Sequence, residues 1–265
     1  MSLYLLPVCY TLFVWWFSTG VILYLTGLPR PTYRWTLGAA TLLLLLALAG
    51  LHLTRNDASV GGAYLAFSCA LLVWAWQEIA FLLGTVTGPR RTPCPAGASG
   101  WRRAHLALQT LLHHELALLA LGAAVLLCVR DGSNPTGLWT FAVLWTMRQS
   151  AKLNVFLGVR NLSENFLPAH LKYLQTYFRR APMNPLFPVT VASAIWVATL
   201  LWQGATADAT GAFSATCLTF AATLLSLAVL EHGFMVLPLP SEALWAWGLR
   251  SRVANRVEVR RSTRL

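Results

Sequence analysis

Apolar residues fall in blocks of about 20, separated by short polar connections, and this pattern predicts the fold. A helix of that length, at ~1.5 Å rise per residue, crosses a hydrocarbon layer of ~30 Å. The weaker ten-residue alternation that is typical of membrane barrels is absent from the sequence. We therefore expect an all-α integral membrane protein, a bundle of about seven transmembrane helices. The expected spans are Leu3–Thr26, Trp35–Leu53, Gly62–Val86, Ala104–Val129, Gly137–Val159, Phe187–Gly204 and Ala212–Leu237.

Basic residues are distributed unevenly among the connections, which predicts the orientation in the membrane. Eighteen of the 20 Lys and Arg residues fall on one side of the predicted bundle, and only Arg55 and Arg130 fall on the other. Positive residues stay on the cytoplasmic side of inner-membrane proteins. The N-terminus is therefore expected in the periplasm and the C-terminus in the cytoplasm. The same distribution explains the net charge of +11 without any nucleic-acid partner.

Composition agrees with a single membrane domain over residues 1–265, because 57% of the residues are apolar and only 11% are charged. The five cysteines are scattered, with no pairing that would predict a disulfide or a zinc site. The first ten residues have no basic region, so we expect a retained first span rather than a signal peptide. A basic cytoplasmic tail is expected at about 248–265.

The connection between the fifth and sixth spans, RNLSENFLPAHLKYLQTYFRR, has an amphipathic pattern. It predicts a short helix that lies on the cytoplasmic leaflet, with its basic residues toward lipid headgroups. An ordinary helix packed on the bundle and a helix that docks a partner are the alternatives. The residues expected to contact the membrane surface or a partner are Leu171, Lys172, Leu174, Phe178, Arg179 and Arg180.

The fifth span, Gly137–Val159, carries two basic residues, Arg148 and Lys152, one turn apart. A span that stopped before Arg148 would have about 11 residues, too few to cross a membrane. Arg148 is therefore expected near the middle of the bilayer, where an unpaired charge costs a few kcal/mol. Other helices should present carboxylates to it.

Three of the nine acidic residues lie inside predicted spans, and three histidines lie beside them. At ~1.5 Å per residue, these side chains and the basic pair lie about 10–16 Å from the cytoplasmic ends of their helices. They are expected to converge in one polar layer. The predicted members are Glu78, His113, His114, Glu115, Arg148, Lys152, Asn154, Glu231 and His232. Tryptophans deep in the spans, Trp15 among them, are expected to be packing residues, with stacking on a flat macrocycle as the alternative.

Three interpretations of this polar layer stay open. The first is a charge-neutral structural network. The second is a pocket for a polar or pigment-like ligand, in which a neutral histidine ligates a metal such as the magnesium of a chlorin. The third is a catalytic pair of iron ions, although the neighbours HHE and EH lack the Glu-x-x-His spacing of helical di-metal sites. The candidate metal ligands are Glu78, His113, Glu115, Glu231 and His232.

The stretch from Lys152 to Phe178, KLNVFLGVRNLSENFLPAHLKYLQTYF, resembles the hallmark segment of the photosynthetic complex assembly protein 2 family (PuhE) of purple phototrophic bacteria. The chain length, the first span and the Glu-His pair near the last span resemble that family as well. The resemblance implies an inner-membrane accessory factor for assembly of the photosynthetic reaction centre and light-harvesting complex, or one that modulates bacteriochlorophyll supply. It implies no catalytic residues.

We therefore expect a multi-pass protein of the inner or intracytoplasmic photosynthetic membrane that is more an assembly factor than an enzyme. Its expected partners are membrane lipid and either reaction-centre or light-harvesting subunits or pigment-biosynthesis proteins. Bacteriochlorophyll or a precursor is the expected ligand, with iron as the alternative. A metalloenzyme acting on a tetrapyrrole or carotenoid, and a structural subunit of the complex, are the two alternative functions.

Overall fold

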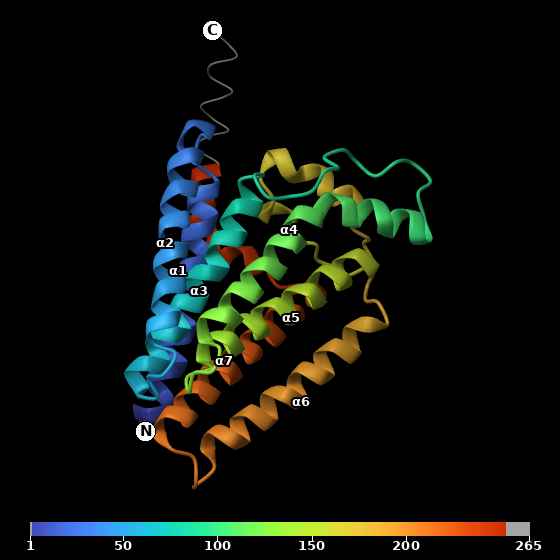
Figure 1. Ribbon diagram of the computed structural model, residues 1–265. Coiled ribbons are helices and arrows are strands. Elements are labelled where there is room, and N and C mark those ends of the chain that lie inside the picture. Colours follow the sequence, from blue (N-terminus) through green and yellow to red (C-terminus); the bar gives the residue numbers. More distant parts are fainter. Residues whose placement is uncertain (1, 253–265) are drawn as a thin grey trace.

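The computed structural model describes residues 2–252, which form seven long helices, four short 3₁₀ helices and a helical stretch at 246–252, with no strand in that range. The N-terminus lies at one end of the bundle and the C-terminal segment at the other (Figure 1). The long helices are α1 Ser2–Thr26, α2 Tyr33–Leu53, α3 Val60–Leu82, α4 Gly100–Val129, α5 Thr136–Leu157, α6 Leu186–Thr206 and α7 Ala212–Val236.

Six of these helices, all except α5, are long and apolar enough to span a membrane. Helix α5 is less apolar because Arg148, Gln149, Lys152 and Asn154 stand in its second half. The protein is thus a multi-pass membrane protein built from helices. The sequence predicts seven crossings of the membrane, and this number holds only if α5 crosses as well.

Helices α3 and α7 form the centre of the bundle, and they are the most buried of the spans. Helices α1 and α5 each pack against both of them, whereas α2 packs on α3 and α4. Helix α6 packs along α7 on the outside of the bundle and contacts α5 less extensively (Figure 1). Between α3 and α7 the rings of Phe67 and Phe220 stack with centroids 4.2 Å apart. We call these two rings, with Ala63, Leu224 and the residues packed on them, the Phe67–Phe220 cluster.

Helix α4 bends where the loop that follows α3 packs against it (Figure 1). The backbone N–H of His114 donates to the carbonyl of Thr87 at 2.9 Å, and Arg90 N–H donates to the carbonyl of Gln109 at 3.3 Å. Gly88 permits this approach, because a Cβ atom there would lie 2.1 Å from the Gln109 oxygen. The loop therefore supplies backbone hydrogen-bond partners at the bend, and His114 is held beside it.

The segment between α5 and α6 packs on the bundle, in agreement with the second of the three alternatives. It forms two 3₁₀ turns, η2 Glu164–Phe166 and η3 Ala169–Tyr177, rather than one α-helix. Leu171 and Leu174 are buried against Phe81 and Leu82 of α3, and Phe178 is half-buried. The basic residues Lys172, Arg179 and Arg180 are exposed.

The C-terminal segment, residues 238–252, folds back and packs along α1. The turn η4, Ser241–Trp245, is fixed by the indole of Trp245, which donates to the carbonyl of Trp16 at 3.0 Å. Gly248 lies so close to α1 that a Cβ atom there would be 2.4 Å from the Gly20 carbonyl oxygen. The expected tail at 248–265 therefore begins as a packed segment, and residues 253–265 lie outside the described range.

Candidate functional site

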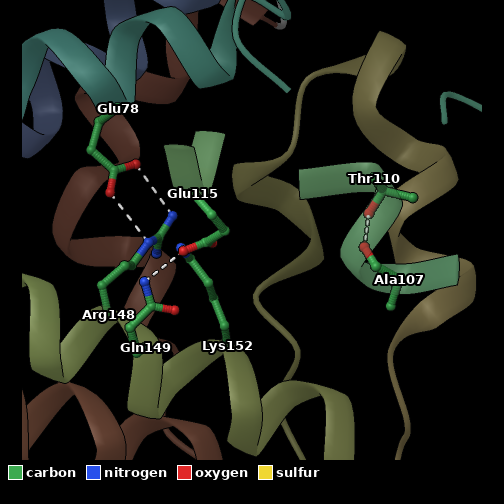
Figure 2. Close-up of polar contacts among 7 residues, drawn as sticks. All are labelled: Glu78, Ala107, Thr110, Glu115, Arg148, Gln149 and Lys152. Atoms are coloured by element: carbon green, nitrogen blue, oxygen red, sulfur yellow. Dashed lines mark hydrogen bonds and ion pairs between the residues drawn. The ribbon is translucent and has the colours of Figure 1, made fainter. Parts of the chain in front are cut away.

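Arg148 on α5 forms an ion pair with Glu78 on α3 (Figure 2). Its Nε atom lies 3.2 Å from Glu78 Oε1, and its Nη2 atom donates to Oε2, also at 3.2 Å. Only the Nη2 contact has hydrogen-bond geometry, and the Nε contact is a charge contact alone. The carboxylate that the sequence requires near Arg148 is thus supplied by α3.

A second ion pair joins α5 to α4 (Figure 2). Lys152 Nζ donates to Glu115 Oε1 at 2.6 Å, and Gln149 Nε2 donates to Glu115 Oε2 at 2.7 Å. Arg148 and Lys152 stand one turn apart on the same face of α5, yet Arg148 pairs with α3 and Lys152 pairs with α4. Helix α5 is therefore held between α3 and α4 by two neutralised charge pairs.

A third polar group connects α5 with α6 and α7 through hydrogen bonds. His232 Nδ1 donates to the Ala228 carbonyl at 2.8 Å, so its Nε2 atom accepts from the Ser150 hydroxyl at 2.9 Å. Asn154 donates to Thr190 Oγ1 of α6 at 3.2 Å and accepts from Asn184 at 3.0 Å. Because both ring nitrogens of His232 are occupied, this histidine acts as a structural connector.

The two neighbouring histidines of α4 have opposite surroundings. His113 is exposed on the outer face of the helix, so the structure does not bring it into the polar layer. His114 is buried, with its ring 4.6 Å from the ring of Phe81. Neither ring nitrogen of His114 has a hydrogen-bond partner among residues 2–252, and the same holds for the buried amide of Gln77. These two side chains are the unsatisfied polar groups closest in sequence to the ion pairs.

Glu231 on α7 is not part of an ion pair among the described residues. Its Oε1 atom accepts a hydrogen bond from the indole of Trp15 on α1 at 2.8 Å, and the side chain is exposed. Trp15 was expected to pack or to stack on a flat macrocycle, so sequence reasoning missed its role as a hydrogen-bond donor. The only signal for it was the depth of Trp15 in the first span.

The five candidate metal ligands are not gathered in one place. Within residues 2–252 no group of three or more His, Cys, Asp or Glu side chains is arranged to hold a metal ion. Glu78 and Glu115 face cations, His113 is exposed, and Glu231 faces an indole. This geometry supports the interpretation of the polar layer as a neutralised network more than that of a di-iron site.

Comparison with known proteins gives one informative relative. The chain is 44% identical over 252 residues to a protein of Rhodobacter capsulatus described as an uncharacterized 30.4 kDa protein in the puhA 5′ region. The alignment covers 91% of this chain and 89% of that protein. No solved structure matches the chain. A family profile, "Protein of unknown function (DUF3623)", matches residues 1–256, so the chain belongs to the DUF3623 family.

Proposed function

We propose that this protein is a non-enzymatic accessory factor of the inner membrane that assists assembly of the photosynthetic reaction centre and light-harvesting complex. The observation that carries the proposal is the relative in the puhA 5′ region, a photosynthesis gene region, which aligns with nearly the whole chain at 44% identity. The resemblance of the Lys152–Phe178 segment to the PuhE family points the same way.

The chemistry of the polar layer supports an accessory role more than an enzymatic one. Both carboxylates of the layer that meet α5 are already neutralised, by Arg148 and Lys152, and His232 uses both ring nitrogens for hydrogen bonds inside the bundle. Groups that are engaged in this way are poor general bases or metal ligands. Their effect is to fix the relative positions of α3, α4, α5 and α7.

Handling of bacteriochlorophyll or a precursor is a finer form of the proposal. Its support is His114, whose ring nitrogens have no partner among residues 2–252, since a neutral imidazole nitrogen can ligate the magnesium of a chlorin. His114 is only 1% exposed, so a pigment would reach it only if α3 and α4 separated at Phe81.

The test is affinity purification of the tagged full-length protein from membranes of its phototrophic host, during and after the onset of photosynthetic growth. During assembly, we expect reaction-centre or light-harvesting subunits to co-purify with the tagged protein. We expect the tagged protein to be absent from mature complexes. Stoichiometric presence in mature complexes would instead identify a structural subunit.

Absorbance spectra and metal content of the same preparation separate the remaining alternatives. A bacteriochlorophyll or precursor band would support pigment handling. About two irons per chain, with turnover of a tetrapyrrole or carotenoid, would replace the proposal with the metalloenzyme.

A further inference from the structure

Glu231 continues a face of α7 that is otherwise buried in the core. Phe220, Leu224, Leu227 and Glu231 follow each other at intervals of three or four residues and so share one side of the helix. The first three are 0%, 3% and 6% exposed, whereas Glu231 is exposed. Glu231 is therefore the accessible end of a helix face whose other residues are buried.

Glu78 and Arg148 stand in the same layer, above the Phe67–Phe220 cluster. Glu78 follows Phe67 by eleven residues on α3, and Arg148 follows Leu144 by four residues on α5, so each shares a face with a residue of that cluster. The side chain of Arg148 is 38% accessible even though it is paired with Glu78. Arg148 and Glu231 are thus both accessible, at a level next to the Phe67–Phe220 cluster.

The charges of this layer do not balance when Glu231 is ionised. The pairs Glu78–Arg148 and Glu115–Lys152 are each neutral, and they contain every basic residue that stands in the interior of the described spans. Glu231 keeps one hydrogen bond, from Trp15, and has no basic group within 4.0 Å among residues 2–252. A lone carboxylate in a membrane-spanning helix is costly and marks a functional position. One positive charge from a ligand would complete the layer.

The aromatic residues beside Glu231 indicate which kind of cation fits. Trp15 holds the carboxylate through its N–H group, and the ring of Trp245 packs edge-on against the Trp15 ring at a centroid distance of 5.1 Å. Trp15 contacts only Oε1 of the carboxylate, which leaves Oε2 able to accept a hydrogen bond from an ammonium group. Calcium or magnesium would need six or more oxygen ligands, whereas the layer offers Glu231 as its one carboxylate without a cation.

We propose that Glu231 and Trp15 form an intramembrane binding site for a ligand that carries a single ammonium group. This inference does not depend on the proposed function in assembly. The ammonium group could belong to a small amine or to the headgroup of phosphatidylethanolamine, since the recognition chemistry is the same. The two sources are separated by the experiment.

The experiment measures thermal unfolding of the full-length protein in nanodiscs of phosphatidylglycerol, which has no amine, with ethylammonium chloride as the probe. Sodium chloride at equal ionic strength is the reference. At ten times its Kd, ethylammonium should raise the Tm by about 3–5 °C. Glu231→Gln should abolish this rise and should not lower the Tm without ligand, because the uncompensated charge is gone. Glu242→Gln, at an exposed carboxylate hydrogen-bonded to Asn165, should keep the rise.

A second variant and a second lipid make the result independent of how well Glu231→Gln folds. Trp15→Phe removes the N–H donor and should lose most of the ethylammonium response. If nanodiscs containing phosphatidylethanolamine raise the Tm of the unmodified protein but not that of Glu231→Gln, the lipid headgroup is the ligand. A response to ethylammonium alone identifies a small amine. An equal response of the unmodified protein and Glu231→Gln, or no response of the unmodified protein in either medium, would overturn the proposal.

Discussion

Arg148 contacts Glu78 through two nitrogen atoms, and neither partner can be removed without leaving the other charged inside the helix layer. Taking two charges out of water costs free energy that their attraction offsets only when the geometry is good. An ion pair inside the bundle is therefore poor evidence of net stability, but removing only one of its two partners is destabilising because the other charge is left uncompensated. The same reasoning applies to Lys152 and Glu115.

Arg148→Leu should lower the free energy of unfolding by about 2–3 kcal/mol, because it leaves Glu78 without its cation; the loss is smaller than for a fully buried pair since the Arg148 side chain is 38% accessible. The measurement is unfolding of the purified protein in mixed micelles, followed by circular dichroism. The double variant Arg148→Leu/Glu78→Leu should recover most of the loss, since no uncompensated charge remains.

Arg102→Leu is the matched control, because Arg102 is an exposed arginine at the start of α4. It should change the free energy of unfolding by less than about 0.5 kcal/mol. Equal losses for Arg148→Leu and Arg102→Leu would show that the Glu78 pair does not hold α5 in place.

At the scale of elements, the end of α3 is capped by a histidine from a distant segment. His170 in η3 donates through Nε2 to the carbonyl of Leu82, the last residue of α3, at 3.0 Å. Burial lowers the pKa of His170, Arg30 and Arg91 nearby lower it further, and the hydrogen bond to Leu82 opposes them. Gly84 adopts φ +78° beside this ring, where a Cβ atom would lie 2.9 Å from His170 Cδ2.

The contact between η3 and α3 should weaken as the solution becomes acidic. Because the pKa of His170 is lower in the folded protein than the unfolded value of about 6.5, the unfolded state binds more protons and stability rises with pH. The contribution of His170 is complete above pH ~6.5 and is lost as the pH falls below it. Hydrogen exchange of residues 169–177, corrected for intrinsic rates, should be faster at pH 5 than at pH 8.

His170→Gln keeps a donor for the Leu82 carbonyl and does not titrate, so it serves as the control for this pH dependence. Exchange in this variant should change much less between the two pH values. Identical pH dependence in both proteins would assign the effect to other groups.

The C-terminal segment and α1 approach each other closely at glycine. A Cβ atom at Gly248 would lie 2.4 Å from the Gly20 carbonyl oxygen, whereas at Gly38 on α2 it would meet no atom within 4 Å. Gly248→Ala should therefore displace the segment from α1 and speed tryptic cleavage at Arg250. Gly38→Ala should leave cleavage unchanged and, as an alanine in a helix interior, stabilise the protein by about 0.5–1 kcal/mol. Equal cleavage rates in the two variants would show that the contact between Gly248 and Gly20 does not protect Arg250 from trypsin.

At the scale of the whole molecule, charge is segregated between the two ends of the bundle. The end that contains the α3–α4 loop, η3 and the C-terminal segment carries most of the arginines, while Arg55 and Arg130 stand at the opposite end, where the backbone N–H of Asn134 donates to the carbonyl of Arg55. The positive-inside rule predicts that the arginine-rich end faces the cytoplasm. This orientation requires α5 to cross the membrane.

Cysteine labelling tests the crossing of α5 directly. In a variant without the five native cysteines, Ser133→Cys before α5 should react with a membrane-impermeant maleimide added to intact spheroplasts. Lys172→Cys after α5 should react only once the membrane is opened. Asn56→Cys, in the loop at the same end as Ser133, should label like Ser133→Cys. Labelling of Ser133→Cys and Lys172→Cys from the same side would contradict seven crossings.

The sequence by itself determined the helical membrane fold, the positions of the seven long helices to within a few residues, and the need for carboxylates near Arg148 and Lys152. Apolar block length and the cost of charge in hydrocarbon are properties of the chain alone, so they can be read without a structure. The depth of Glu78 and Glu115 likewise follows from their distance along each helix.

Only the tertiary structure decided which groups meet. Depth does not give the rotation of a helix about its axis, so His113 and His114, adjacent in sequence, came to lie outside and inside the bundle. It also does not give the neighbour of each helix, so Glu231 faces the indole of Trp15 rather than a cation. The choice between lipid and protein contact for Leu171 and Leu174 was likewise made by the apolar surface that Phe81 and Leu82 offer at the end of α3.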